Sequence, residues 1–304
     1  MKHITTGLKF PEGPVALLDG SVLVCEVGGL AIHRITPDGG RTVAVRLEGG
    51  PAGAALGPGG ALYVCNVGPP PLTERNGVVV PTFADNGPPS GRIERVDLAT
   101  GEVRMLYREC DGVPLKAPND LVLDAYGGIW FTDSGHVRAT DRDHGAVYYA
   151  RADGSFIARM AYPLLGPNGI GLSPDGRNLY VAETPTARVW RFELAGPGEI
   201  IRVRGRPLGG RAELLAGCGD YRMFDSLAVD AEGWVSVATL IKGGITSISP
   251  DGKHTEFLEL PDRYVSNLCF GGPDMKTAFV TMGGSGSVAA IPWPRAGLVL
   301  NHAA

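Results

Sequence analysis

Cysteine is scarce in this sequence, with five in 304 residues, and the five lie far apart. No Cys-x-x-Cys pattern or His-rich pairing accompanies them, which argues against a disulfide framework or a zinc–thiolate site and favours free, buried thiols in a reducing cytoplasm. Residues 1–10 lack the continuous apolar stretch of a signal peptide. Residues 49–73 carry no charge but contain too many glycines and prolines for a helix in lipid. We therefore expect a cytoplasmic protein without a membrane partner.

Basic runs and several catalytic signatures are also absent. The chain carries 28 Lys and Arg against 32 Asp and Glu, a net charge of −4, and no cluster of positive charge suggests a nucleic-acid groove. The patterns Gly-x-Ser-x-Gly, His-Glu-x-x-His and Gly-x-x-x-x-Gly-Lys-Ser/Thr do not occur, so a serine hydrolase, a zinc protease and a phosphate-loop protein lack their usual signatures. Small molecules are the expected partners, and the oligomeric state is left open.

Glycine and proline, in contrast, are abundant, with 45 and 24 residues, or about 23% of the chain. This content excludes a helical bundle or a long coiled coil, while a hydrophobic fraction of 44% is ample for a core. No helical period extends beyond short stretches. The sequence therefore predicts a folded all-β protein that is rich in turns.

Short apolar alternations recur six times, and each is followed by a turn and a second apolar strand. First strands are expected near residues 14–17, 54–56, 121–123, 170–172, 227–229 and 268–270, and third and weaker fourth strands follow. Six units of four antiparallel strands predict a six-bladed β-propeller, with residues 1–304 as one domain. The last unit lacks a fourth strand, so we expect residues 2–8 to complete it. The alternative, a pair of β-sandwiches, predicts no shared register.

A common register links the six units. Eight residues after the position just ahead of each first strand, five units have a glycine and the sixth has Asp274; the glycines are Gly20, Gly60, Gly127, Gly176 and Gly233. Glycine is the residue that a tight hairpin needs where φ is positive. The units are therefore predicted to be hairpins in one register.

The positions ahead of the first strands should converge, because the first strand of each blade is innermost and starts at one mouth of the central channel. These positions are Glu12, Ala52, Asn119, Asn168, Asp225 and Ser266. Two carboxylates in one mouth repel each other unless a cation or a proton lies between them, and carboxylate and amide oxygens suit a hard divalent ion. We expect one such ion at Glu12, Asn119, Asn168 and Asp225. Calcium fits best, with magnesium, manganese or zinc as the alternatives.

Four segments give the chain a resemblance to the senescence marker protein/gluconolactonase-like (SGL) family of metal-dependent six-bladed propellers. They are Phe10-Pro11-Glu12-Gly13-Pro14, Pro118-Asn119-Asp120 with Ile129-Trp130-Phe131-Thr132-Asp133, Pro167-Asn168-Gly169-Ile170-Gly171-Leu172-Ser173-Pro174-Asp175-Gly176, and Phe224-Asp225-Ser226-Leu227. Sugar-lactone members often have a basic side chain just before the Asn-Asp pair, whereas here Ala117 and Pro118 precede it and Lys116 is one step further away.

The resemblance implies that Glu12, Asn168 and Asp225 bind a catalytic divalent ion, and that Asn119 completes the metal shell or contacts the substrate. It also implies hydrolytic opening of a lactone, with the metal as Lewis acid and Asp225 as general base. A more distant relative that cleaves phosphofluoridates suggests the rival role of Asp225 as nucleophile. A phosphotriesterase and a non-catalytic calcium-binding propeller are the alternative functions.

Loops after the second strands should lie on the same face as the metal residues. The second blade inserts about residues 67–90 and the third residues 134–145, and loops of this length tend to be functional. We expect both to roof the pocket. Asn66 and Asp133 end second strands and His136 lies in the third-blade loop, so these residues, with Asn119, are the predicted substrate contacts. Apolar residues in the longer loop favour a substrate more hydrophobic than gluconolactone; they are Val67, Leu72, Val78, Val79, Val80 and Phe83.

Overall fold

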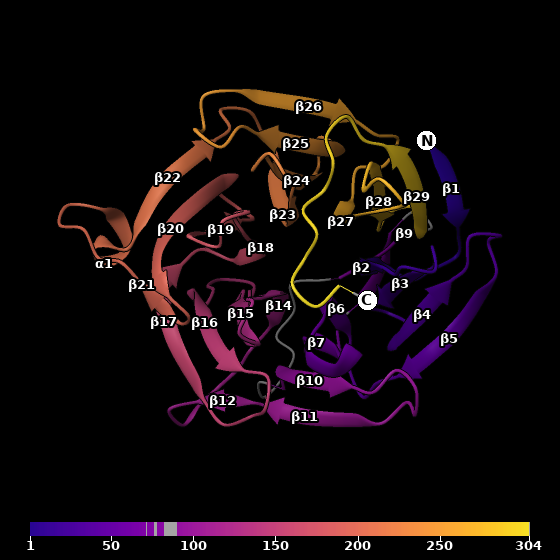
Figure 1. Ribbon diagram of the computed structural model, residues 1–304, viewed down its shortest axis with the longest axis horizontal. Coiled ribbons are helices and arrows are strands. Elements are labelled where there is room, and N and C mark those ends of the chain that lie inside the picture. The colour runs from indigo at the N-terminus through magenta and orange to yellow at the C-terminus, as the bar shows by residue number, and fades with distance from the viewer. Residues whose placement is uncertain (71, 76–77, 82–89, 304) are drawn as a thin grey trace.

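In the computed structural model, which describes residues 1–70, 72–75, 78–81 and 90–303, six sheets surround a central channel like the blades of a propeller (Figure 1). Blade 1 contains β2 (Pro11–Ala16), β3 (Val22–Glu26), β4 (Ala31–Ile35) and β5 (Arg41–Arg46); blade 2 contains β6 (Pro51–Leu56), β7 (Leu62–Asn66), β10 (Arg92–Val96) and β11 (Val103–Tyr107); blade 3 contains β14 (Pro118–Leu123), β15 (Gly128–Asp133), β16 (Gly145–Arg151) and β17 (Ile157–Leu164). Blade 4 contains β18 (Pro167–Leu172), β19 (Asn178–Glu183), β20 (Arg188–Gly196) and β22 (Ala212–Gly217); blade 5 contains β23 (Met223–Val229), β24 (Val235–Leu240), β25 (Gly244–Ile248) and β26 (Thr255–Glu259); blade 6 contains β27 (Val265–Gly271), β28 (Thr277–Met282), β29 (Ser287–Pro292) and β1 (Lys2–Thr5).

The N-terminal strand closes the ring, as the sequence predicts. β1 pairs with β29 in an antiparallel manner, with Lys2 opposite Ala290 and His3 opposite Ala289. The six innermost strands contact one another in a closed cycle, β2 to β6, β14, β18, β23, β27 and back to β2. Pairing of the first and last segments of the chain within one blade therefore closes the ring.

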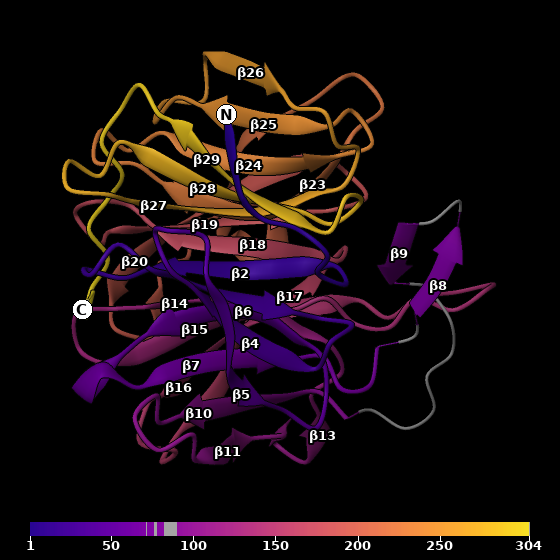
Figure 2. The ribbon, with the colours of Figure 1, turned by 90° about the vertical axis from the view of Figure 1, so that its right-hand side faces the viewer.

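Short elements lie outside the blade pattern. They are β8 (Leu72–Arg75), β9 (Val78–Pro81), β12 (Glu109–Cys110), β13 (Val113–Pro114), β21 (Glu199–Ile200), the 3-10 turn η1 (Pro58–Gly60) and α1 (Pro207–Gly210). The β8–β9 hairpin belongs to the long loop of blade 2 and projects on the side of the ring opposite the C-terminus (Figure 2). Of the apolar loop residues named above, Phe83 lies outside the described residues.

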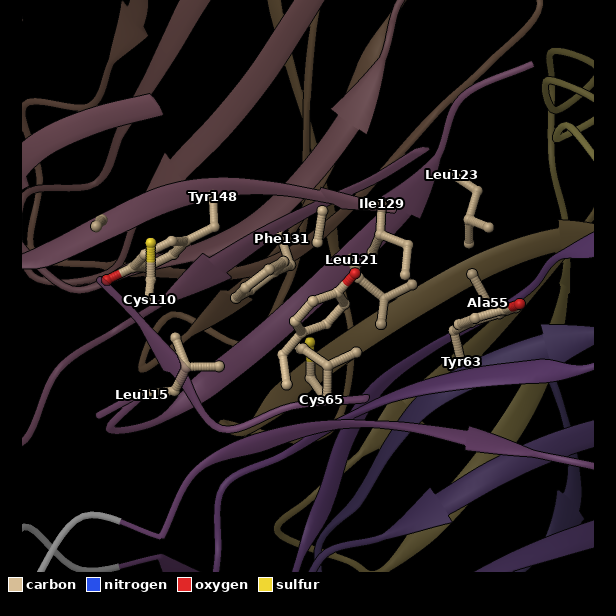
Figure 3. Packing of buried hydrophobic residues seen from close by; sticks show 14 of the residues in the cluster. Ala55, Tyr63, Cys65, Cys110, Leu115, Leu121, Leu123, Ile129, Phe131 and Tyr148 are labelled. Carbon is tan, nitrogen blue, oxygen red and sulfur yellow. The ribbon is translucent and has the colours of Figure 1, made fainter. Parts of the chain in front are cut away.

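The core consists of apolar layers between neighbouring blades. In β7, Tyr63 and Cys65 pack toward blade 3, whereas Leu62 and Val64 pack toward blade 1. Figure 3 shows the layer between blades 2 and 3, where Phe131 of blade 3 lies in the same cluster as Tyr63 and Cys65. Because both faces of the second strands are covered, they read as continuous apolar runs and not as alternating ones.

The hairpin register is confirmed in five blades and shifted in the sixth. All five predicted turn glycines have positive φ, from +68° at Gly176 to +83° at Gly233. In blade 6 the turn is displaced by one residue, so Met275, with φ +56°, takes the place of glycine, and its N–H donates to the carbonyl of Gly272. Asp274 therefore breaks the sequence rule because the first strand of this blade is longer by one residue.

All five cysteines are free; Cys25, Cys65 and Cys110 are buried, whereas Cys218 and Cys269 are half-buried. None of the helices in the described part of the chain has the length and apolar character needed to cross a membrane. Thus the predicted free thiols are present, but only three of them are fully buried.

Candidate metal centre

The four predicted ligands lie at equivalent irregularities of the innermost strands. In each of these strands the pairing register shifts at the ligand: between Glu12 and Val15, between Pro118 and Leu121, between Pro167 and Ile170, and between Phe224 and Leu227. An irregularity of this kind bends the strand and re-aims the side chain next to it. The same irregularity occurs in the other two innermost strands, between Pro51 and Ala54 and between Val265 and Asn267, so all six ring positions are structurally equivalent.

Glycines next to two of the ligands allow the strands to approach one another closely. Gly13 has φ +42°, and a Cβ there would lie 2.2 Å from the carbonyl oxygen of Ala52 in blade 2. A Cβ on Gly169 would lie 2.5 Å from the backbone nitrogen of Leu227 in blade 5. Both distances are too short for any side chain, so these glycines bring the neighbouring strands together at the site.

Hydrogen bonds connect ligands that are far apart in sequence. The Asn168 amide donates to Oδ1 of Asp225, and the Ser226 hydroxyl donates to the Asn168 oxygen at 3.2 Å. Asn267, from blade 6, donates through its amide to Oε2 of Glu12 at 2.9 Å. Blades 4 and 5 are therefore joined by one set of hydrogen bonds and blades 6 and 1 by another, and the charge of Glu12, which acts on Asp225, couples the two sets into one buried polar network.

The electrostatics of this network are dominated by buried carboxylates. Burial raises the pKa of Glu12 to about 7, against the hydrogen bonds from Asn267 and Gly13 that lower it. Burial, followed by the charge of Glu12, raises the pKa of Asp225 well above its ordinary value. The same two causes raise the pKa of Asp120 to about 7. The charge of Glu12 thus destabilises the ionised forms of Asp225 and Asp120.

A divalent cation fits these residues. Across the described ranges, neither Glu12 nor Asp225 forms an ion pair with a Lys, Arg or His side chain. The donors are two carboxylates and two amides, and the described residues contain no group of three or more His, Cys, Asp or Glu side chains placed to hold a metal. Oxygen donors with little nitrogen or sulfur favour calcium or magnesium over softer ions.

Three residues next to ring positions take part in the site although the sequence pattern did not single them out: Asp120, Ser226 and Asn267. Each directly follows a position of the predicted ring, so the same register that selects Asn119, Asp225 and Ser266 contains the signal for them. Ser266 itself is buried and its hydroxyl donates to the carbonyl of Pro11 at 2.8 Å. It joins blades 6 and 1 and supplies no charge.

The predicted substrate contacts differ in their surroundings. Asn119 is half-buried on β14, and His136 is half-buried with its Nε2 3.1 Å from the carbonyl oxygen of Lys116. Asn66 is fully buried; its amide donates to Glu94 and its oxygen accepts the Gly68 N–H, both at 2.9 Å. These bonds occupy both ends of the Asn66 amide.

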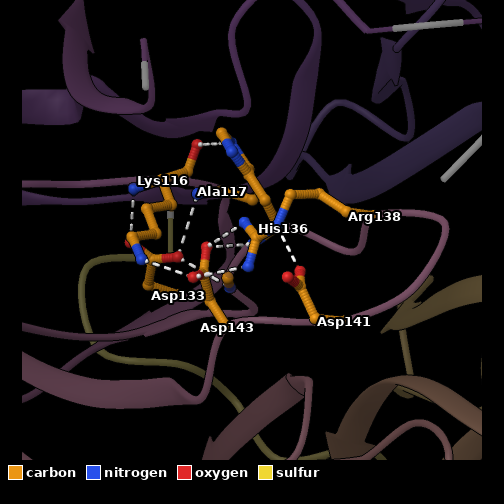
Figure 4. A network of polar contacts seen from close by, with 8 residues as sticks. Lys116, Ala117, Asp133, His136, Arg138, Asp141 and Asp143 are labelled. Carbon is orange, nitrogen blue, oxygen red and sulfur yellow. Dashed lines mark hydrogen bonds and ion pairs between the residues drawn. The ribbon is translucent and has the colours of Figure 1, made fainter. Parts of the chain in front are cut away.

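Asp133 is buried and accepts three backbone N–H groups, from Lys116 at 2.7 Å, Ala117 at 2.9 Å and Gly135 at 3.0 Å. Figure 4 shows this carboxylate beneath the segment that leads to Asn119. A carboxylate that accepts several backbone donors is held rigidly in one orientation. For Asn66 and Asp133 we therefore propose a role in positioning the loops, and direct substrate contact remains a prediction for Asn119 and His136.

Ion pairs fasten the third-blade loop beside His136 (Figure 4). The Lys116 ammonium lies 2.9 Å from Oδ1 of Asp143, and the Arg138 guanidinium donates to both oxygens of Asp143 at 3.2 Å. Partial burial opposes ionisation of Asp143, but the hydrogen bonds from Arg138 and Lys116 outweigh it and lower its pKa far below the usual range. Lys116 is thus engaged by the loop.

A cavity of about 620 Å³ occupies the channel on the other side of the ligand ring. Gly13, Asp120 and Asn267, which directly follow ring positions, line its inner end, and apolar side chains such as Leu123 and Phe270 line its walls. The C-terminal segment crosses the far end (Figure 1), where Asn301 donates to the Leu123 carbonyl at 3.1 Å. The cavity therefore meets the ligand ring at a polar inner end and is apolar along its walls.

Together the closed ring and the oxygen-rich mouth define a six-bladed β-propeller with a candidate divalent-metal centre. Residues 10–284 match the family described as the SMP-30/Gluconolactonase/LRE-like region, and the chain belongs to this family. The family resemblance and the fold predicted from the sequence are thereby confirmed.

Three relatives illustrate the range of the family. The chain is 25% identical to diisopropyl-fluorophosphatase of Loligo vulgaris, over 75% of this chain and 89% of that protein, and 25% identical to a gluconolactonase of Zymomonas mobilis, over 88% and 75%. It is 29% identical to a 6-deoxy-6-sulfogluconolactonase of Pseudomonas putida, over 60% of each. Among solved structures, the calcium-binding protein regucalcin of Agrobacterium tumefaciens, at 20% identity, shares the fold with a TM-score of 0.78 over 100% of this chain and 97% of that one.

Proposed function

We propose that this protein is a divalent-metal-dependent lactonase that hydrolyses a lactone ring to the hydroxy acid. The observation that supports the proposal is the buried pair Glu12 and Asp225: the charge of Glu12 acts on Asp225, the Asn168 amide donates to Asp225, and neither carboxylate has a cationic side-chain partner among the described residues. The names of two curated relatives, a gluconolactonase and a sulfogluconolactonase, support the reaction class.

One divalent ion, calcium in the first instance, would be held by Glu12, Asn168, Asp225 and Asn119. Bound there, it would supply Lewis-acid polarisation of the substrate carbonyl and positive charge for the developing oxyanion. Magnesium, manganese and zinc are the alternatives to be tested.

Asp225 is the proposed general base. The Asn168 amide donates to its Oδ1 and so orients the carboxylate. In the proposed step Asp225 takes a proton from water as the water oxygen attacks the carbonyl carbon; the ring C–O bond then breaks, and the departing alkoxide oxygen takes up the proton. The rival role, attack by the Asp225 carboxylate itself, predicts a covalent intermediate that water later hydrolyses.

We propose that the long loops of blades 2 and 3 cover the pocket and select the substrate. Asn119 and His136 are the proposed side-chain contacts to it. Leu72 and Val78–Val80 of the long loop are half-buried on β8 and β9. Their apolar character supports a substrate more hydrophobic than a sugar lactone. The five free cysteines support a reducing, cytoplasmic location, and we propose that residues 1–304 act as one propeller domain without nucleic-acid or membrane partners.

A phosphotriesterase is the second candidate function. It is favoured by the similarity to diisopropyl-fluorophosphatase, which extends over 89% of that protein. A tetrahedral phosphorus ester places its developing charge where the lactone carbonyl would place its oxyanion, so the same residues suit both reactions.

The test is proton release from sugar, alkyl and aromatic lactones and from paraoxon, each with and without a chelator. We expect lactone turnover that the chelator abolishes and calcium restores. Asp225→Asn should lower turnover by at least about 100-fold, whereas Asp175→Asn, in an exposed turn at the other end of blade 4, should leave it unchanged. Turnover of paraoxon alone would favour the second candidate, and metal binding without any turnover would favour a calcium-binding propeller.

A further inference from the structure

A repeated contact supports three of the four proposed metal ligands. In blades 1, 3 and 4 the residue just before the ligand is a proline, and an acidic residue that ends the second strand lies opposite this proline; the pairs are Pro11 and Glu26, Pro118 and Asp133, and Pro167 and Glu183. Proline has no N–H with which to bond the neighbouring strand. The backbone just ahead of each ligand therefore needs another anchor.

In all three blades the acidic side chain provides that anchor at the same position. Each carboxylate accepts the N–H of the residue three positions before the ligand: Lys9 to Glu26 at 2.7 Å, Lys116 to Asp133 at 2.7 Å, and Leu165 to Glu183 at 2.8 Å. All three residues are buried, at most 9% exposed as whole residues. A charged acceptor on a buried backbone donor makes a strong hydrogen bond, and removing it leaves that donor unpaired.

The blades without a metal ligand provide the contrast. In blade 2, where the ring position is Ala52, the proline faces Asn66, whose oxygen instead accepts the Gly68 N–H. In blade 6, where the ring position is Ser266, no acidic residue ends the second strand, and Asp262 accepts the Tyr264 and Ser285 N–H groups from elsewhere in the loops. Among the described strands, the arrangement with proline and an acidic residue therefore occurs only in blades with a proposed ligand, and blade 5, which carries Asp225, is the ligand blade without it.

The fourth ligand is connected to the same arrangement through blade 4. Asp225 follows Phe224 and no proline, and the Phe224 N–H donates to the carbonyl of Thr184, the residue after Glu183. Glu183 also accepts the Thr186 hydroxyl at 2.9 Å, which fixes the turn that carries this carbonyl. Glu183 therefore supports two ligands, Asn168 directly and Asp225 through the turn.

We infer that Glu26, Asp133 and Glu183 are positioning residues that set the geometry of the metal ligands without touching the ion. This inference rests on the proposed metal centre. Side chains that orient metal ligands commonly change metal affinity by about 10–100-fold when they are removed. Loss of any of the three should therefore weaken calcium binding even though a ligand is never altered.

The two conservative amide variants should behave differently. Glu183→Gln keeps an oxygen for the Leu165 N–H and an amide for the Thr186 hydroxyl, so its calcium dissociation constant should stay within about threefold of the wild type. Asp133 accepts N–H groups on both of its oxygens. In Asp133→Asn one of these donors would face an amide NH₂, and the dissociation constant should rise about tenfold.

The experiment is calorimetric titration of calcium into the metal-stripped full chain, with urea unfolding as a second measurement. Asp133→Ala and Glu183→Ala should raise the dissociation constant about 10–100-fold. Asp262→Ala removes a similarly buried carboxylate in a blade without a ligand, so it should lower the urea midpoint and leave the dissociation constant unchanged. If an alanine variant does not fold, the contrast between Glu183→Gln and Asp133→Asn decides.

The outcomes separate this inference from the proposed function. A wild-type chain that binds no calcium, magnesium or manganese overturns both. A wild-type chain that binds calcium, with unchanged affinity in Asp133→Asn and in the folded alanine variants, overturns the positioning role alone. An equal loss of affinity in Asp262→Ala and Asp133→Ala would also overturn it, because the effect would then be one of general stability.

Discussion

The metal-free protein should lose stability as the pH rises, because Glu12 is buried beside other carboxylates. Its pKa rises from an ordinary value of 4.5 to about 7 in the folded chain, chiefly through burial. Between these values the folded state holds a proton that the unfolded state has released, so the free energy of unfolding falls as the pH increases. At about 1.4 kcal/mol per pKa unit, the contribution of Glu12 amounts to about 3 kcal/mol at pH 8.

The measurement is urea unfolding from pH 4 to pH 8 of wild type and Glu12→Gln, both stripped of metal on a chelating resin. The comparison is needed because exposed carboxylates with lowered pKa values, such as Asp220, give the opposite trend in both proteins. The free energy of unfolding of Glu12→Gln relative to wild type should rise by about 3 kcal/mol over this range. Calcium at 100 times its dissociation constant should add about 2.7 kcal/mol to wild type alone. A difference between the two proteins that does not change with pH would refute the electrostatic reasoning.

Three further substitutions test the backbone and the loop. Gly176→Ala places a Cβ at φ +68° with no atom within 4 Å, so urea unfolding should show a loss of about 1–2 kcal/mol from backbone strain alone. Gly169→Ala, whose Cβ would lie 2.5 Å from the Leu227 nitrogen, should cost about 3 kcal/mol and, unlike Gly176→Ala, weaken calcium binding in the same titration. Asp143→Asn removes the partner of Lys116 and Arg138, so trypsin should cleave the loop at Arg138 faster than in wild type; an unchanged cleavage rate would show that the ion pairs do not hold the loop.

The ring itself could be predicted from the sequence because two local rules repeat in it. Positive φ in a tight hairpin demands glycine, and both faces of an inner strand are covered, which produces apolar runs at fixed offsets from Gly20 to Gly233. The fourth strand of blade 4, β22, is not evident from the sequence because residues 197–211 separate it from β20, its partner, and no local pattern spans this insertion. The glycine rule also fails in blade 6, because one extra residue in the first strand moves the positive-φ position from Asp274 to Met275.

The surroundings of the ligands depend on contacts that no local pattern reveals. The sequence places Glu12 and Asp225 at equivalent positions, but the register shifts that re-aim them, and the partner Asn267 that bonds Glu12, arise from pairing between strands and between blades. The positions of Glu26 and Glu183 at the ends of second strands can be predicted from the sequence. The backbone N–H group that each side chain accepts is visible only in the three-dimensional structure. The sequence predicts Asn66 and Asp133 at the ends of second strands, and their hydrogen bonds favour a role in supporting the loops.

The cost of the buried carboxylates bears on why only some blades contribute charge. Every additional acid at the ring would raise the pKa of Glu12 and Asp225 further and destabilise the metal-free chain. Ala52 and Ser266 occupy the two remaining ring positions without charge, and Ser266 stabilises the contact between blades 6 and 1 through its bond to Pro11. Two carboxylates neutralise a divalent ion, whereas a third at the ring would leave excess charge in a buried site. The choice of residues at the six positions therefore suits one divalent ion, and burial together with the charge of Glu12 already raises the pKa of neighbouring Asp120 to about 7.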